Sequence, residues 1–138
     1  MLTKIDHIGI AVNSLAESLP FYRDQLGMSL SGTEEVASQK VRVAFLAIGE
    51  SKIELLEPTS PDSPVAKFLE KNGPGIHHLA YNVADIEAAI SRLTAEGARM
   101  IDAAPRAGAH GASIAFVHPK SSGGVLTELC QSGEEHAH

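Results

Sequence analysis

Two histidines and two glutamates occupy matching positions in this 138-residue chain, and their side chains are of the kind that bind metal ions. His7 and His78 each lie in a small apolar segment, at an offset of 71 residues. Glu54 and Glu128 follow about fifty residues later, in the segments Ile53-Glu54-Leu55 and Thr127-Glu128-Leu129. Two imidazoles and two carboxylates make a mixed nitrogen and oxygen ligand set that suits a divalent metal. We therefore predict a metal site with four protein ligands; the alternative is that all four are chance strand residues.

The same offset relates further segments, so the chain contains an internal repeat. It aligns Gly9 with Ala80, and it aligns Val43-Ala44-Phe45-Leu46 with Ile114-Ala115-Phe116-Val117. Self-similarity at a fixed period is typical of repeated structural units. We predict two copies of one unit related by an approximate two-fold axis, which brings equivalent residues together near that axis.

Each copy is predicted to be a β-α-β-β-β module, which places the fold in the α+β class. Apolar alternation and turn residues predict strands at 5–12, 28–34, 40–48 and 52–57 in the first module. Ser14 is expected to cap the first helix and Gly27 to end it, while Pro20 predicts a kink or a late start. The second module is expected to have a helix at 85–96 and strands at 76–83, 98–102, 112–118 and 124–130.

We expect a single domain over 1–138, organised as a first module, a linker with a short helix, a second module and a tail, at 3–58, 59–74, 75–132 and 133–138. Each half would be marginally stable alone, so the halves must share a core. The predicted architecture is two curved sheets that enclose the metal site, with the helices outside.

The composition excludes some classes of partner. A net charge of −6, with no run of Lys and Arg, disfavours nucleic acid. No apolar run is long enough to span a membrane, and Met1-Leu2-Thr3-Lys4 leads directly into a strand rather than into the apolar core of a signal peptide. We expect a cytoplasmic protein. Cys130 follows Leu129 in an apolar strand and is interpreted as a packed thiol rather than a nucleophile.

With these residues in place, the chain resembles the vicinal oxygen chelate (glyoxalase-like) superfamily, and within it the methylmalonyl-CoA epimerase family, over nearly its whole length. The resemblance lies in an ordered set of segments: Ile5-Asp6-His7, Ile53-Glu54-Leu55-Leu56-Glu57-Pro58, Ser63-Pro64-Val65-Ala66-Lys67-Phe68-Leu69, Gly75-Ile76-His77-His78, and His118-Pro119-Lys120 through Gly124-Val125-Leu126-Thr127-Glu128-Leu129-Cys130-Gln131. It implies one divalent metal, with Co2+ favoured over Mn2+, Ni2+, Zn2+ or Mg2+. It also implies interconversion of the C2 epimers of methylmalonyl-CoA.

The chemistry of that reaction can be argued independently of the resemblance. Removing the C2 proton gives an enolate whose charge needs a Lewis acid. Inversion is easiest with one base on each face of the planar intermediate, and Glu54 and Glu128 suit these two roles as well as metal binding. Some members of the family carry glutamine at the Glu54 position and a further glutamate where this chain has Val43, which cannot transfer a proton. Either Glu54 substitutes for that glutamate or only one face is served by a side chain, so Glu128 is the surer base.

An acyl-CoA substrate also needs groups that meet its phosphates. Lys120, Ser121 and Arg106 are candidates because they lie in loops of the second module, although a solvated surface role is an equal alternative. His77 is expected to pack rather than to touch the site. The superfamily resemblance favours a homodimer.

Three other functions remain open for such a fold. A lactoylglutathione lyase-type isomerase also uses two histidines and two glutamates beside a metal. An iron-dependent dioxygenase needs only one carboxylate, so the extra ligand at Glu54 argues against it. A metal-free module that binds small molecules is the alternative from outside the enzymes.

Overall fold

The computed structural model of the chain describes residues 1–133, so residues 134–138 of the expected tail lie outside the described residues. The chain divides into two compact units. The first unit comprises residues 7–77, and the second comprises residues 1–6 together with the chain from His78 onward. Two strands, β1 (Leu2–Ala11) and β5 (Gly75–Val83), contribute residues to both units.

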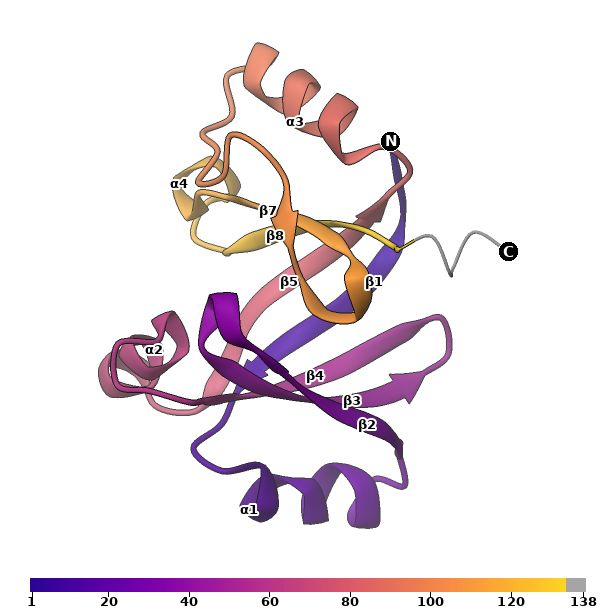
Figure 1. Cartoon of the computed structure of the whole chain (residues 1–138), viewed down its shortest axis with the longest axis vertical. Coiled ribbons are helices and arrows are strands. Elements are labelled where there is room, and N and C mark those ends of the chain that lie inside the picture. Colours follow the sequence, from indigo (N-terminus) through magenta and orange to yellow (C-terminus); the bar gives the residue numbers. More distant parts are fainter. Residues whose placement is uncertain (134–138) are drawn as a thin grey trace. The chain divides into compact units, whose positions relative to one another are not determined.

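In the first unit, residues 7–11 of β1 are followed by two helical segments, three strands and a further helix (Figure 1). These elements are α1 (Leu15–Leu19), a π-helix (Pro20–Gln25), β2 (Ser29–Val36), a 3-10 turn (Ala37–Gln39), β3 (Val41–Ile48), β4 (Ser51–Pro58) and α2 (Pro64–Asn72). The strands are ordered β2-β3-β4-β1. β4 is antiparallel to β3 and parallel to β1, which is the pairing that a βαβββ module requires.

The start of α1 and the change of helix type at Pro20 both follow from the sequence. The Ser14 side chain accepts the backbone N–H of Glu17 at 3.3 Å, which makes it the predicted N-cap. Pro20 has no N–H to donate, and the helix changes from α to π geometry at this residue. The Leu26 N–H therefore reaches back five residues to the Phe21 carbonyl at 2.8 Å. The sequence predicted a kink or a late start at Pro20, whereas the helix starts at Leu15 and Pro20 marks a change of helix type.

The two sides of the first unit's strands carry different residues. On one side, Leu55 of β4 packs with residues of β3 and of the helix, in a cluster of Val12, Leu15, Ala44, Leu46 and Leu55. Because side chains alternate along a strand, the neighbouring Glu54 and Phe45 point to the other side. Both residues are buried, so that side also carries packed groups.

The second unit repeats this order of elements. Its helices and strands after β5 are α3 (Ile86–Ala95), β6 (Arg106–Ala107), a 3-10 turn (Ala109–Gly111), β7 (Ser113–Val117), α4 (Pro119–Ser122) and β8 (Thr127–Gln131) (Figure 1). The strands are ordered β5-β8-β7-β6, and β5 and β8 are parallel, as β1 and β4 are in the first unit. Residues 1–6 belong to this unit, where the Thr3 hydroxyl donates to the Asn82 carbonyl at 3.2 Å.

The core of the second unit lies under α3. Asp85 caps this helix as predicted, because its carboxylate accepts the backbone N–H of Ala88 at 3.1 Å. Buried residues of α3 and of the strands then form one cluster: Val83, Ile86, Ala89, Ile90, Ala115, Val117 and Leu129. Ala115 and Leu129 lie on the helix side, so their neighbours Phe116 and Glu128 point to the other side.

The strand predicted at 98–102 is wrong. Only an isolated bridge joins Met100 to Val117, and the short strand β6 lies further on, at Arg106–Ala107. The cause is a side chain, because the Asp102 carboxylate accepts the backbone N–H of Phe116 at 2.8 Å. A side-chain acceptor thus replaces the carbonyl that a regular strand would supply at this point. The loop at 118–124, between β7 and β8, contains the short helix α4.

The predicted fold class is confirmed: the protein is α+β and has two βαβββ modules in tandem. No helix among residues 1–133 is long and apolar enough to cross a bilayer.

Candidate functional site

In the first unit, the strand register brings Glu54 and His7 to the same side of the sheet. Glu54 of β4 lies opposite Gly9 of β1 and opposite Phe45 of β3. His7 precedes Gly9 by two residues and therefore shares its side. The His7 Nδ1 and Glu54 Oε2 atoms are 3.2 Å apart, and the two residues are only 4% and 7% exposed.

The second unit has the same arrangement at equivalent positions. Glu128 of β8 lies opposite Ala80 of β5 and opposite Phe116 of β7. His78 precedes Ala80 by two residues, and its Nε2 atom is 3.0 Å from Glu128 Oε1. Both residues are 4% exposed. Each unit therefore holds one buried histidine–glutamate pair in the same register.

The pairs differ in the nitrogen that faces the carboxylate, because His7 uses Nδ1 whereas His78 uses Nε2. The repeat thus preserves the strand positions but not the orientation of the imidazole rings. In the second unit the ring is held by an aromatic neighbour: Phe116 makes an edge-to-face contact with His78, with 5.6 Å between the ring centroids.

Phe116 is fixed in turn by a charged pair. The Arg106 guanidinium lies 5.4 Å from the centroid of the Phe116 ring, in a cation–π contact. Arg106 also pairs with Asp102, with 3.4 Å between Nε and Oδ1, and the other Asp102 oxygen accepts the Phe116 backbone N–H. Arg106 is therefore a partner of Asp102 and Phe116, rather than the bare loop cation that the sequence indicated.

A lysine accompanies the first pair. Lys52 lies directly opposite His7 on the parallel strand, two residues before Glu54, and so shares their side of the sheet. Its ammonium is 3.9 Å from Glu54 Oε2, and about a third of the side chain is exposed. A positive charge thus stands next to the first carboxylate.

Val43 lies on the same side of β3 as Phe45 and is 3% exposed. It lies opposite Glu34 of β2, so this half-buried glutamate shares that side. Sequence reasoning missed Glu34 and Lys52, because neither has a counterpart in the other module. It also missed Asp6, which is 6% exposed. The sequence feature that could have revealed it is a carboxylate inside an apolar strand.

Both pairs have donor atoms suited to a divalent metal ion. Neighbouring ligand atoms about 2.1 Å from one ion are about 3.0 Å apart in an octahedral site and about 3.4 Å apart in a tetrahedral one. The separations of 3.0 and 3.2 Å within the pairs lie in this range. Imidazole with carboxylate is a donor set that binds Mn2+, Co2+, Ni2+ and Zn2+. The residues present therefore fit such an ion.

The other predicted substrate residues lie around α4. Lys120 is exposed, and its backbone N–H donates to His118 Nδ1 at 3.0 Å. The Ser121 hydroxyl accepts the backbone N–H of Arg99 at 2.7 Å. Lys120 and Ser121 thus adjoin Arg99 and His118, whereas Arg106 belongs to the Asp102–Phe116 cluster. His77 packs edge-to-face on Phe68 at 5.1 Å, and Cys130 packs with Ile114 and Phe116.

The fold and the paired residues define a class of proteins. The chain belongs to the glyoxalase/bleomycin resistance protein/dioxygenase superfamily, whose family model matches residues 6–116. Within that superfamily, the resemblance to methylmalonyl-CoA epimerases is confirmed.

The similar proteins match nearly the whole chain. An ethylmalonyl-CoA/methylmalonyl-CoA epimerase of Cereibacter sphaeroides is 42% identical over 133 residues, which cover 95% of this chain and 99% of that protein. A crystal structure of a hypothetical protein from Bacillus halodurans C-125 has a TM-score of 0.93 and 53% identity, covering 95% of both chains. A methylmalonyl-CoA epimerase solved in complex with methylmalonyl-CoA and NH4+ has a TM-score of 0.93 and 44% identity, covering 97% of both chains.

Proposed function

We propose that this chain is a divalent-metal-dependent methylmalonyl-CoA epimerase, an isomerase that inverts the C2 centre of its substrate by proton transfer. The observation that carries the proposal is the buried histidine–glutamate pair that recurs in the same register in each unit, His7 with Glu54 and His78 with Glu128. The identity of 42–44% to methylmalonyl-CoA epimerases over 95–97% of the chain supports this substrate.

In this proposal the four residues of the two pairs hold one ion together. Two imidazoles and two carboxylates balance the charge of a divalent cation, and Co2+ is the favoured metal, with Mn2+, Ni2+, Zn2+ and Mg2+ as alternatives. When bound, such an ion acts as a Lewis acid that stabilises negative charge developing on the thioester oxygen.

The proton transfers are assigned to the two carboxylates. Glu128, in its ionised form, removes the C2 proton from one face of the substrate, and Glu54, which carries a proton at that stage, gives this proton to the opposite face. The reverse reaction starts with Glu54 ionised and Glu128 protonated. Val43 is apolar and cannot transfer a proton, so we assign the second face to Glu54. Burial of both glutamates keeps bulk water away from the intermediate, and this strengthens electrostatic interactions inside the site.

The residues around each pair position the substrate and the paired side chains. Gly9 and Ala80, the register partners of the two glutamates, leave room beside them for a substrate. Phe116 holds the His78 ring through its edge-to-face contact, and the Asp102–Arg106 pair holds Phe116. A substrate with a CoA moiety also needs cationic groups, and Lys120, Ser121 and Arg106 are the residues we propose for this part. We expect a homodimer.

The test combines metal content with isotope exchange. Protein purified without chelators should contain about one divalent ion per chain, and should exchange the C2 hydrogen of methylmalonyl-CoA in deuterated water while interconverting the epimers. Removal of the ion with a chelator should stop both processes, and addition of Co2+ should restore them. Interconversion at an unchanged rate in metal-free protein would contradict the proposal.

A second candidate function has one observation in its favour. A probable lactoylglutathione lyase of Vibrio cholerae is 31% identical over 135 residues, which cover 97% of this chain and 94% of that protein. A lyase would act on the hemithioacetal of glutathione and would leave methylmalonyl-CoA unchanged. Turnover of the hemithioacetal alone would move the assignment to that reaction. If the protein binds small molecules but contains no metal and turns over neither substrate, the metal-free binding module is favoured instead.

A further inference from the structure

We propose that Arg99, His118 and Lys120 bind the phosphate groups of the acyl-CoA. This inference rests on the proposed function for the identity of the ligand. The three residues lie in the second unit, around the loop that joins β7 to β8. We call them the cationic cluster.

The backbone holds the cluster together. The His118 N–H donates to the Arg99 carbonyl at 2.8 Å, and the Arg99 N–H donates to the Ser121 hydroxyl at 2.7 Å. The Lys120 N–H donates to His118 Nδ1 at 3.0 Å. These hydrogen bonds join the segment at Arg99 to the start of α4.

Among residues 1–133, the positive charges of Arg99 and Lys120 have no acidic partner. The sequence has 17 Asp and Glu against 11 Lys and Arg, so carboxylates outnumber cations. Five of the cations pair with one: Arg23, Lys40, Arg42, Lys52 and Arg106. Arg99 and Lys120 are exposed, and no described carboxylate lies within ion-pair distance of either.

These two charges act on the histidine between them. The pKa of His118 is lowered from its usual value, first by desolvation and then by the positive charges of Arg99 and Lys120. The lowered pKa favours the neutral form of the imidazole. Because its Nδ1 accepts a hydrogen bond, the proton lies on Nε2, which can donate to an anion. Two cations and one N–H donor are the groups that recognise phosphate oxygens.

The cluster adjoins the strand that carries the proposed base. Glu128 of β8 lies opposite Phe116 of β7, Val117 and Thr127 form the last register pair, and His118 is the residue that follows Val117 into the loop. His118 also follows Phe116, the aromatic partner of His78, by two residues. An extended ligand with its reactive end at Glu128 can therefore continue along the β7–β8 loop toward the cluster.

The test measures the binding of CoA itself, without any reaction. The chain has no Trp, so calorimetry is the suitable readout. The full-length protein should bind CoA, and the double variant Arg99→Gln/Lys120→Gln should bind it about tenfold or more weakly, because hydrogen bonds to charged groups are lost. Pantetheine, which has no phosphate, should bind both proteins equally. Dephospho-CoA separates two supporting outcomes: a loss for CoA alone places the 3′-phosphate at the cluster, and a loss for both places the diphosphate there.

The control is Lys71→Gln/Arg92→Gln, which removes two exposed cations that likewise have no described ion pair elsewhere on the chain. It should leave CoA binding unchanged. Equal affinity of the cluster variant and the unaltered protein for CoA would overturn the inference, as would an equal loss for pantetheine. The two proposals can fail separately. If the unaltered protein does not epimerise methylmalonyl-CoA but the cluster variant still loses CoA binding, the cluster is supported and the proposed function is rejected.

Discussion

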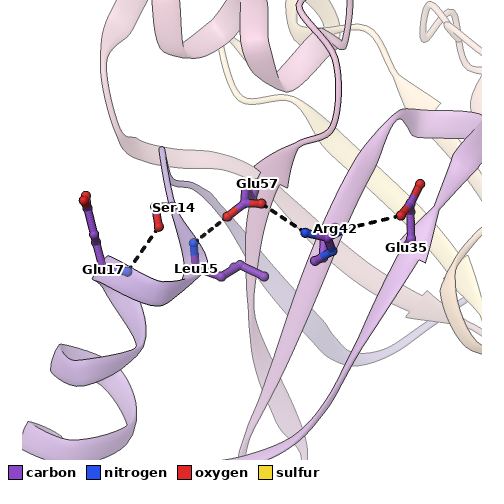
Figure 2. Close-up of polar contacts among 6 residues, drawn as sticks. All are labelled: Ser14, Leu15, Glu17, Glu35, Arg42 and Glu57. Atoms are coloured by element: carbon purple, nitrogen blue, oxygen red, sulfur yellow. Dashed lines mark hydrogen bonds and ion pairs between the residues drawn. The ribbon is translucent and has the colours of Figure 1, made fainter.

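The Glu57 carboxylate accepts the backbone N–H of Leu15, with 2.7 Å between Oε1 and N (Figure 2). Glu57 follows Glu54 by three residues on β4, and Leu15 is the first residue of α1. The second unit has the same contact, because the Gln131 side chain accepts the N–H of Ile86 at 2.8 Å. Each strand that carries a proposed base is therefore tied to the start of its own unit's helix.

The first prediction separates the hydrogen bond of Glu57 from its charge. Glu57→Gln keeps an acceptor for Leu15, as Gln131 does for Ile86, and loses only the ion pair with Arg42, whose NH1 atom is 3.5 Å from Oε2. Such partly exposed pairs contribute about 0–1 kcal/mol. Glu57→Ala leaves the Leu15 N–H without its acceptor and should lower the free energy of unfolding by about 1–3 kcal/mol. Urea denaturation measures both values.

Gln131 provides the matched control. Gln131→Ala should lower the free energy of unfolding by about as much as Glu57→Ala does. Gln131→Glu should leave it nearly unchanged, because an acidic group is favourable at the start of a helix. Equal losses for Glu57→Gln and Glu57→Ala would show that the charge, not the acceptor, matters at this position.

The repeat in the sequence predicted which residues of the two units are equivalent beside the glutamates. The offset of 71 residues pairs Gly9 with Ala80 and Phe45 with Phe116. These residues are the register partners of Glu54 and Glu128 in their respective units. Such a prediction is possible because backbone pairing and side-chain alternation fix the faces of a strand, and both leave a period in the sequence.

Contacts made by single side chains leave no such period, and these were not predictable. Asp102 takes the backbone N–H of Phe116, so the chain makes only a bridge where a strand was expected. Lys52 approaches Glu54 because of the strand register, yet its equivalent in the other module does not repeat the charge. The role of Arg106 depends on one aromatic ring and one carboxylate, and neither can be inferred from spacing.

The second prediction concerns the stability of the folded protein at acidic pH. The hydrogen bond from Lys40, followed by that from Ser60, lowers the pKa of Asp62 from 3.8 to about 2. A depressed folded-state pKa means that the ionised carboxylate stabilises the folded protein. This contribution is complete above about pH 4 and is lost as the pH falls through about 2. The stability difference between the unaltered protein and Asp62→Asn should therefore shrink over that window. Parallel stability curves from pH 5 to pH 2 would refute this coupling.

The third prediction concerns metal affinity and depends on the proposed site. The Lys52 ammonium is 3.9 Å from Glu54 Oε2 and therefore repels a cation bound by that carboxylate. Lys52→Gln should strengthen Co2+ binding by about threefold to tenfold, the effect being limited by the partial exposure of the lysine. Competition with a chromophoric chelator measures the affinity. Lys67→Gln, an exposed lysine of α2, is the control, and weaker binding in Lys52→Gln would contradict the argument.

The fourth prediction tests a close approach in the loop before β7. A Cβ atom at Gly108 would lie 2.7 Å from Ile114 Cγ2, a branch that cannot rotate away as the end of a long side chain can. Gly108→Ala should lower the free energy of unfolding by about 1–3 kcal/mol. Ile114→Leu removes the Cγ2 branch, so the double variant should lose less than the sum of the single losses. If the losses in unfolding free energy of the two single variants add up in the double variant, the destabilisation does not come from the contact with Ile114 Cγ2.

The last prediction distinguishes the two proposed bases. If Glu54 and Glu128 serve opposite faces of the substrate, Glu128→Gln should slow C2 exchange in deuterated water by about 100- to 10,000-fold for one epimer only. Glu54→Gln should slow it for the other epimer, and neither variant should invert the centre. Glu34→Gln is the control, because Glu34 is a further glutamate on the same side of the strands, opposite Val43. If Glu54 and Glu128 are the two bases, this variant should exchange and invert both epimers as the unaltered protein does. Loss of exchange for both epimers in a variant that keeps its metal would require a single base instead of two.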